Sequence, residues 1–247
     1  MPDLPYQRII SLVPSLTELL IDLGLKDHLA GRTRFCVHPK TDVDDIEIIG
    51  GTKNPRLGKI IEMDPDLIIA NKEENRKEDI EDLSKYTKVQ VTEIDTIQDA
   101  LLEISGLGLL LGVNETAQQL ITNITDLLSK KPEVQPLSTA YFIWKDPWMT
   151  VGSDTYIHNV MQEYQLHNVF GDQTRYPQTS LKSLASKNPD LILLSSEPYP
   201  FKEKHIKEIR KACPVSKIEL VNGEWFSWYG SRMISAFKWL NNWRSKI

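Results

Sequence analysis

The chain has 247 residues, 40% of them hydrophobic, which is enough apolar material for one large domain or two of ordinary size. Its 34 Asp and Glu outnumber 29 Lys and Arg, the formal charge is −5, and no basic block suited to a phosphate backbone occurs. Composition and charge therefore exclude an intrinsically disordered chain and make nucleic acid an unsuitable partner.

The first half of the chain alternates strand and helix signals. β-rich segments predict strands at residues 8–13, 29–34, 46–49, 67–70 and 89–94, and helices are expected near residues 55–63 and 75–85. Ser15 to Glu18, with the sequence SLTE, predicts a capping box for a helix that ends at Gly24. Asn54 before Pro55 predicts a capped helix, so the loop GGTKN would end at a helix amino terminus. This alternation predicts a small α/β lobe.

A long helix is expected next, over residues 114–131, with one apolar stripe and Pro132 as its stop. At 1.5 Å per residue it would be a rod of roughly 26 Å. The second half then predicts a strand at 139–144, a tight DPW turn and a helix near Ser153. Further strands are expected at 191–195 and 217–221, and a closing helix at about 231–243.

One phrase occurs twice, as IIEMDPDLIIANKEEN around Pro65 and as SLASKNPDLILLSSEPYPF around Pro189. Each copy reads as a helix, a Pro-Asp break, a buried strand and a polar loop. Ligands of open parallel sheets bind outside the carboxyl ends of the strands. We therefore predict two similar α/β lobes with parallel-type sheets, bridged by one long rigid helix, and a ligand cleft between the lobes. The expected boundaries are 1–113 for the first lobe, 114–136 for the bridging helix and connection, and 137–247 for the second lobe.

Two polar loops are candidate ligand contacts in the first lobe. GGTKN carries Lys53 and Asn54 beside two glycines that allow close backbone approach, and NKEEN carries Asn71 and Lys72 after the next buried strand. The alternative is an ordinary glycine turn with a solvated lysine.

Aromatic side chains are the candidates in the second lobe. Trp144 and Trp148 bracket the turn after its first strand, where their rings could stack on a planar or cationic ligand or pack in the core. A loop with three large rings is expected to cover a ligand, and its members are Trp225, Trp228 and Tyr229. Tyr156 and His158, near a helix start, could reach the cleft or only cap it, whereas Trp239 and Trp243 are assigned to packing.

Cys36 and His38 are two residues apart, so on an extended backbone both would point to one face and could share a soft metal. Without a third ligand, a buried thiol beside a turn histidine is the competing interpretation. Cys213 is the second of only two cysteines, so a disulfide framework is not supported. No GxSxG, HExxH, P-loop or GxGxxG motif is present, so we expect no enzyme; a metal-dependent enzyme using Cys36 and His38 is the weakest alternative.

The opening RIISLVPSLTELLIDLG, the paired PDLI phrases and the closing WFSWYGSR resemble the helical-backbone (class III) substrate-binding proteins of ABC importers, most of all the cobalamin and ferric-siderophore branch. The resemblance covers essentially the whole chain. It implies a monomer that binds a cobalamin-, haem- or ferric-siderophore-like metal chelate with little lobe movement and has no covalent cofactor. It also implies a periplasmic or cell-envelope location.

Two departures from the family pattern affect the residues that can be carried over. The aromatic positions of cobalamin binders fall on Lys53 and Asn71, and only the tryptophan at Trp225 is retained. The acidic residues that dock the transporter permease fall on Gly58 and Ser227, although Glu62 and Glu224 lie nearby. The amino terminus also lacks the regions of a secretory signal, so the chain as written is expected to be cytoplasmic. The alternative function is therefore a cytoplasmic small-ligand sensor or carrier of the same fold without transporter docking.

Overall fold

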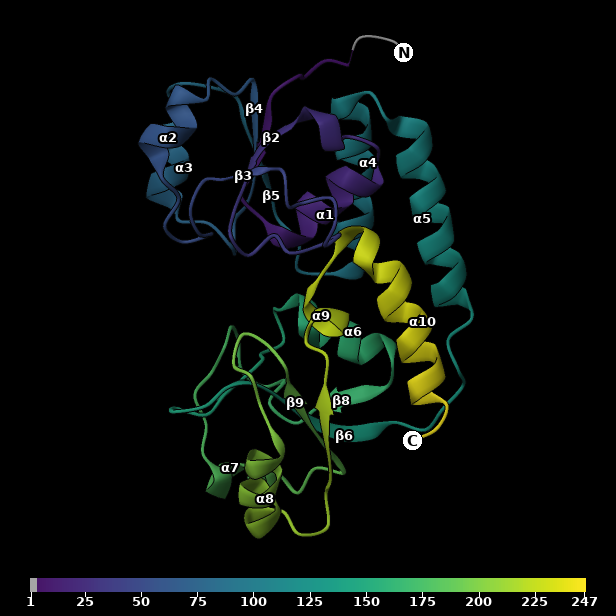
Figure 1. Cartoon of the computed structure of the whole chain (residues 1–247). Coiled ribbons are helices and arrows are strands. Elements are labelled where there is room, and N and C mark those ends of the chain that lie inside the picture. The colour runs from purple at the N-terminus through teal and green to yellow at the C-terminus, as the bar shows by residue number, and fades with distance from the viewer. Residues whose placement is uncertain (1–3) are drawn as a thin grey trace. The chain divides into compact units, whose positions relative to one another are not determined.

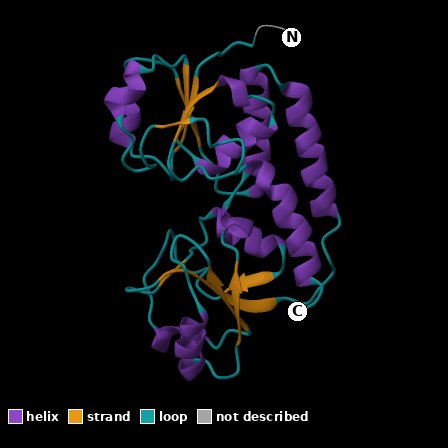
Figure 2. Ribbon diagram, in the orientation of Figure 1, coloured by secondary structure: helices purple, strands orange, loops and turns teal. Residues whose placement is uncertain are grey.

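The computed structural model describes residues 4–247, which form two compact units, each with its own sheet and core (Figures 1 and 2). Unit 1 contains the described residues through Ile94 together with Gln98–Thr125 and Tyr229–Arg232. Unit 2 contains Asp95–Ile97, Asp126–Trp228 and Met233–Ile247. The predicted fold class of two α/β lobes is confirmed, and the boundaries drawn at 113 and 136 stay a prediction.

The sheet of unit 1 is wholly parallel, in the order β3-β2-β1-β4-β5. Its strands are β1 (Ile9–Ser11), β2 (Leu29–Arg32), β3 (Glu47–Ile48), β4 (Leu67–Asn71) and β5 (Val89–Thr92). The helical segments from the same part of the chain are α1 (Pro14–Asp22), η1 (Lys26–His28), α2 (Leu57–Glu62), α3 (Lys77–Leu83), α4 (Ile97–Leu111) and α5 (Asn114–Ser129). Figure 1 shows α2 and α3 on one face of the sheet and α1 and α4 on the other. Because both faces are covered, every residue of β4 is buried, as its continuous apolar run predicts.

Two details of unit 1 differ from the sequence expectation. Helix α1 begins at Pro14 with Val13 as its N-cap and has no side-chain cap, so the capping box predicted at Ser15 is wrong. Ser15 lies inside the first turn because the proline already occupies the first helical position. Helix α4 was not expected at all. Its buried residues do follow helical spacing, but exposed leucines at positions 102 and 109 and two glycines obscure that pattern in the sequence IQDALLEISGLGLLL.

The sheet of unit 2 has the order β10-β9-β6-β7, with β8 also paired to β6. Its strands are β6 (Leu137–Trp144), β7 (Met149–Thr150), β8 (Leu166–Asn168), β9 (Leu191–Ser195) and β10 (Lys217–Val221). All of its pairings are parallel except β6 with β7, which run antiparallel through a hairpin at Asp146 and Pro147. The remaining helical segments are α6 (Tyr156–Glu163), α7 (Leu181–Lys187), α8 (Glu203–Ala212), α9 (Glu224–Ser227), η2 (Gly230–Arg232) and α10 (Met233–Arg244).

The repeated phrase forms the same local structure in both units. Before Pro65 the chain turns at Asp64 with a φ of 48°, and before Pro189 it turns at Asn188 with a φ of 44°. Asp and Asn tolerate this left-handed conformation better than most residues, and the following proline prevents the preceding helix from continuing. The break between helix and strand was therefore correctly predicted from the sequence.

The aspartate of each Pro-Asp pair joins two neighbouring strands at their starts. Asp66 accepts a hydrogen bond of 3.1 Å from the backbone N–H of Arg8, just before β1. Asp190 accepts one of 2.9 Å from the backbone N–H of Ser138 in β6. The shared phrase thus fixes the register of the central strands in both sheets.

The segment Tyr229–Arg232 belongs to unit 1, although the chain before and after it belongs to unit 2. Gly230 has a φ of +86°, and a Cβ at this position would lie 3.2 Å from the Cβ of Leu19 on α1. Arg232 donates from Nε and Nη2 to the carboxylate of Glu18, at 2.8 and 2.6 Å. Burial raises the pKa of Glu18 against the lowering effect of Arg232. This ion pair and the close glycine contact hold the segment against α1.

No helix in the described part of the chain, residues 4–247, is long and apolar enough to cross a membrane.

Candidate functional site

Polar loops follow the carboxyl ends of β1, β3 and β4, and Asn75 joins them. Its Nδ2 donates to the backbone carbonyls of Leu12, at 3.2 Å, and Thr52, at 3.1 Å. Its Oδ1 accepts from the backbone N–H of Asn71 at 2.8 Å. Asn75 is buried and was not singled out from the sequence, because its role depends on loops far apart in the chain. The three loops therefore form one connected surface of unit 1.

Lys53 and Asn54 lie exposed in the second of these loops. Lys53 Nζ donates to the backbone carbonyl of Glu73 at 2.6 Å, so the two polar loops meet although β2 and β1 lie between β3 and β4. The expected helix cap at Asn54 is wrong. Helix α2 starts at Leu57, and the chain instead forms an isolated bridge between Gly50 and Pro55. The loop therefore offers side chains and its own backbone, but no helix amino terminus.

Asn71 ends β4 and is buried, and its amide is used within unit 1. Nδ2 donates to the carbonyl and the hydroxyl of Thr92, while Oδ1 accepts from the backbone N–H groups of Glu73 and Glu74. Its neighbour Lys72 is exposed and pairs with Glu93. Burial raises the pKa of the Glu74 carboxyl. The structure thus gives Asn71 a loop-shaping role, and its predicted contact with a ligand stays a prediction.

Phe35 is an aromatic residue at this surface that the sequence analysis did not select. It is 52% exposed after the end of β2, and its ring lies near Gly51, where a Cβ would come within 3.2 Å of it. The guanidinium of Arg34 lies 5.9 Å from the ring centroid. Among residues 4–247, no ion pair with an acidic side chain is found for Arg34. Unit 1 thus presents an exposed ring beside a cation. The family pattern would instead place its aromatic residues at positions 53 and 71.

Cys36 and His38 lie in the same loop, and Cys36 is fully buried. The hydroxyls of Thr17 and Thr33 lie 3.0 and 3.1 Å from its Sγ, and burial raises the pKa of the thiol. No group of three or more His, Cys, Asp or Glu side chains placed to hold a metal ion occurs within residues 4–247. The two-residue metal site stays a prediction. Cys213 is likewise a free, buried thiol.

In unit 2, Trp144 and Trp148 occupy different environments. Trp144 ends β6 and is 40% exposed, with its ring edge-on to Tyr199 at a centroid distance of 5.6 Å. Trp148 is partly buried against the core, stacked on Phe201 at 5.9 Å. Tyr199 follows β9 in the Pro-rich end of the repeated phrase. It was not selected from the sequence because its neighbours are turn residues. Trp144 and Tyr199 therefore form the aromatic surface at these strand ends.

Tyr156 and His158 are buried at the start of α6, where the side chain of Thr155 caps the helix. The hydroxyl of Thr155 accepts from the backbone N–H of His158 at 3.2 Å. The amide of Asn168 donates to Nδ1 of His158 at 3.1 Å. Desolvation lowers the pKa of His158 and raises that of Tyr156. The contacts of His158 thus lie within unit 2, and the ligand contact predicted for Tyr156 stays untested.

Trp225, Trp228 and Tyr229 are not all carried by a loop. Trp225 lies in the short helix α9 and stacks on Trp239, with centroids 6.2 Å apart and planes 12° from parallel. Trp239 stacks in turn on Trp243 at 5.1 Å, so the packing role predicted for these two rings is supported. Trp228 belongs to unit 2, whereas Tyr229 belongs to unit 1. Whether these rings contact a ligand stays a prediction.

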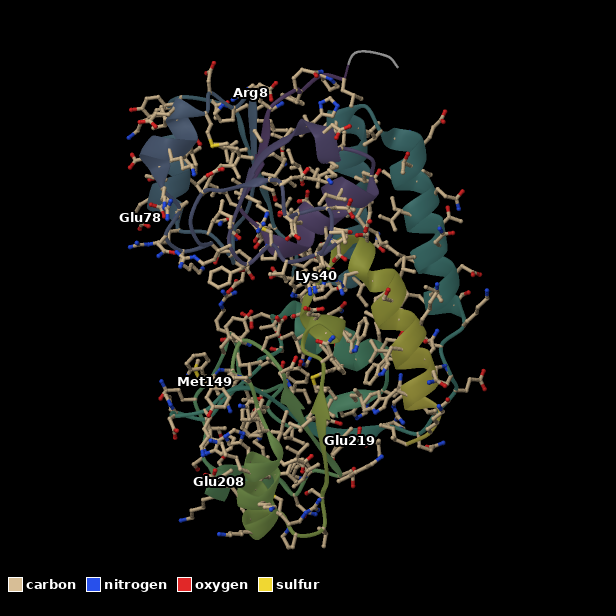
Figure 3. The ribbon with its side chains drawn as sticks, in the orientation of Figure 1. Arg8, Lys40, Glu78, Met149, Glu208 and Glu219 are labelled. Carbon is tan, nitrogen blue, oxygen red and sulfur yellow. The ribbon has the colours of Figure 1, made fainter. Side chains whose placement is uncertain are left out.

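The two expected docking positions are filled differently. Gly58 is exposed on α2. At the other position, the hydroxyl of Ser227 donates to Glu197 Oε1 at 3.1 Å, and the same oxygen accepts from Trp228 Nε1 at 2.8 Å. Glu197 was not selected from the sequence, and it brings a carboxylate beside Ser227. Side chains can be seen in Figure 3, in which Met149 marks the β6–β7 hairpin.

Two α/β units with mainly parallel sheets and aromatic rings at strand ends define a two-lobed α/β protein suited to binding a small ligand. Its structure matches the periplasmic vitamin B12 binding protein BtuF of Vibrio cholerae with a TM-score of 0.84, at 22% sequence identity and over 98% of each chain. The sequence is 28% identical over 201 residues to an uncharacterized ABC transporter substrate-binding lipoprotein, YvrC, of Bacillus subtilis (strain 168), covering 76% of this chain. It is 27% identical over 198 residues to a vitamin B12-binding protein of Vibrio vulnificus (strain CMCP6), covering 77% of this chain and 72% of that protein.

The family model described as periplasmic binding protein matches residues 9–216, and the chain belongs to this family. The match to the Bacillus lipoprotein spans 63% of that protein's length. The recognition made from the opening, the PDLI phrases and the closing motif is confirmed.

Proposed function

We propose that this chain is the substrate-binding component of an ABC-type importer and that it binds a planar, metal-containing ligand of the corrinoid, haem or ferric-chelate class. Its family and the vitamin B12-binding relative, 27% identical, support this proposal. The protein acts by binding and release, without catalysis. It works in the cell envelope, where a substrate-binding protein meets its permease.

The observation that carries the proposal is the exposure of large rings at strand ends in each unit. Phe35 is 52% exposed after β2, and Trp144 is 40% exposed at the end of β6. Burying an exposed ring against a flat ligand removes apolar surface from water and adds a stacking contribution of about 0.5–1.5 kcal/mol. Phe35 is the ring of unit 1 that we assign to ligand contact, and Trp144 with Tyr199 are the rings that we assign in unit 2.

The polar part of the surface suits a ligand that also carries acidic or amide groups. Arg34 lies beside Phe35, and Lys53 lies at the loop that packs against the same ring. Arginine and lysine donate charge-assisted hydrogen bonds to such groups, each stronger than a bond between neutral partners. Unit 1 would therefore contact both apolar and polar parts of the ligand.

Docking to the permease would use carboxylates near the two altered positions. Glu62 is exposed one turn from Gly58 on α2, and Glu197 hydrogen-bonds Ser227. The glycine and serine at the expected positions favour one second candidate, a carrier of the same fold that binds its ligand without a transporter.

Titration of the purified protein with cyanocobalamin, haem and a ferric hydroxamate, followed by tryptophan emission, tests the proposal. We expect saturable quenching by one of the three. Phe35→Ala should weaken that binding by about tenfold, the loss expected for one stacked ring. This substitution removes no tryptophan, so the signal itself is unchanged.

Tyr86→Ala is the matched control, because Tyr86 is also an exposed aromatic of unit 1, at 66%, but precedes β5 and so lies at the opposite end of the strands. It should bind as the unaltered protein does. Absence of quenching by every ligand would reject the proposed ligand class, and equal weakening by both variants would reject the assigned surface.

A further inference from the structure

Helix α8 carries a row of lysines on its exposed side. Lys204, Lys207 and Lys211 are spaced by three and four residues, which places them on one face of the helix, and all three are exposed. At 1.5 Å per residue the row is about 10 Å long. Arg210 is exposed beside it, and Glu203 is the exposed carboxylate of the helix. We call Lys204, Lys207 and Lys211 the lysine row.

Within residues 4–247, none of these three lysines has an ion-pair partner, although some other exposed helical lysines do. Lys77 pairs with Glu81 and Lys130 with Asp126, each one turn away. The other carboxylate of α8, Glu208, which is labelled in Figure 3, pairs with Lys145 on the β6–β7 hairpin. The three positive charges of the lysine row are thus exposed to solvent and not neutralised by an ion pair, although the formal charge of the whole chain is −5.

Helix stability does not account for the row. Cations stabilise the last turn of a helix through its dipole, which explains Arg210 and Lys211. Lys204 lies in the first turn, where the dipole opposes a positive charge. Its position is therefore better explained by a partner outside the chain.

The chemistry of the row points to an extended anionic partner. Lysine is a flexible point charge that suits a diffuse negative surface, whereas arginine is preferred for planar, bidentate recognition. Ile206 and Ile209 of α8 turn toward the core, so the row includes no apolar or aromatic side chain of the kind that anchors a protein interface. Base stacking on single-stranded nucleic acid also needs such rings.

From these observations we propose that the lysine row is a contact surface for an anionic phospholipid bilayer. Each lysine close to such a surface contributes independently to binding, and the attraction falls off within a Debye length. This contact is separate from ligand binding, since the assigned ligand residues lie on other elements.

Flotation with vesicles of phosphatidylglycerol and phosphatidylcholine, compared with phosphatidylcholine alone, tests the proposal. The protein should bind only the anionic vesicles, and raising the salt from about 0.05 to 0.5 M should release it. The triple variant Lys204→Gln, Lys207→Gln, Lys211→Gln should bind on the order of a hundredfold more weakly. Its circular dichroism should be unchanged, because the side chains are exposed.

The control changes the net charge equally but at paired lysines, with Lys77, Lys85 and Lys130 each replaced by Gln. It should keep most of the binding. Equal loss in both variants would show that overall charge, and not the row, governs the contact. A failure to bind anionic vesicles would overturn the proposal, and binding of duplex DNA in its place would assign the row to nucleic acid.

Discussion

Replacing Arg232 with Met tests how strongly the buried ion pair with Glu18 stabilises unit 1. The Glu18 side chain is 11% exposed and would lose both guanidinium donors. A carboxyl left in such a place takes up a proton because its charged form is poorly solvated. Keeping the carboxyl protonated costs about 1.36 kcal/mol for each pH unit above its ordinary pKa of 4.5. Because pH 7 is about 2.5 units above that value, the cost at pH 7 is at most about 3.4 kcal/mol. We expect Arg232→Met to lower the unfolding free energy by up to about 3.4 kcal/mol.

The same reasoning sets the pH dependence. Burial already raises the folded-state pKa of Glu18 in the unaltered protein, and removing Arg232 raises it further, so the variant loses more stability than the unaltered protein as pH rises. At pH 5 the cost should shrink to about 0.7 kcal/mol. Urea unfolding of both proteins at pH 7 and pH 5 measures the two differences. Lys238→Met, an exposed change on α10, should shift stability by less than about 0.5 kcal/mol. An equal loss at the two pH values would refute the argument.

Two glycines of α4 and two buried histidines give further predictions. Gly108→Ala would place a Cβ 2.4 Å from the Cβ of Ala117 on α5 and should destabilise by about 1–3 kcal/mol, whereas Gly106→Ala meets nothing within 4 Å and should stabilise by about 1 kcal/mol. Urea midpoints should therefore move in opposite directions, and a shared direction would contradict the packing described for this helix. Desolvation lowers the pKa of His158 and His205 below the ordinary 6.5, so their contribution is complete above that pH and lost as pH falls through the folded-state pKa. His205→Asn should flatten the loss of stability between pH 7.5 and 5.5, and an unchanged slope would exclude His205 as its source.

The sequence was sufficient to predict most of the framework, because buried strands and proline breaks are local signals. The run LIIAN is apolar enough to identify β4, and Pro65 and Pro189 mark where each strand follows its helix. Helix α4 was missed because exposed leucines at positions 102 and 109 and two glycines obscure the helical spacing of its buried residues. The misplaced caps at Ser15 and Asn54 show that a capping residue type is not enough when a neighbouring proline or bridge sets the helix start.

The candidate site was less predictable, since tertiary contacts decide the use of each side chain. Asn71 looked like a loop ligand and proves to be hydrogen-bonded through its whole amide within unit 1. Phe35 was not selected from the sequence and proves to be an exposed ring against Gly51. Tyr229 follows Trp228 in sequence, yet it belongs to the other unit. A local sequence pattern does not show which residues far apart in the chain will contact each other.

The segment Tyr229–Arg232 also constrains how the protein is made. Within unit 1, the pairing of Arg232 with Glu18 joins residues 214 positions apart in the chain. On the ribosome, α1 must wait until residues 229–232 have emerged before Gly230 and Arg232 can pack against it. The amino-terminal unit can therefore complete its native packing only after almost all of unit 2 has been synthesised, and a fragment ended at residue 125 would keep Glu18 without its partner.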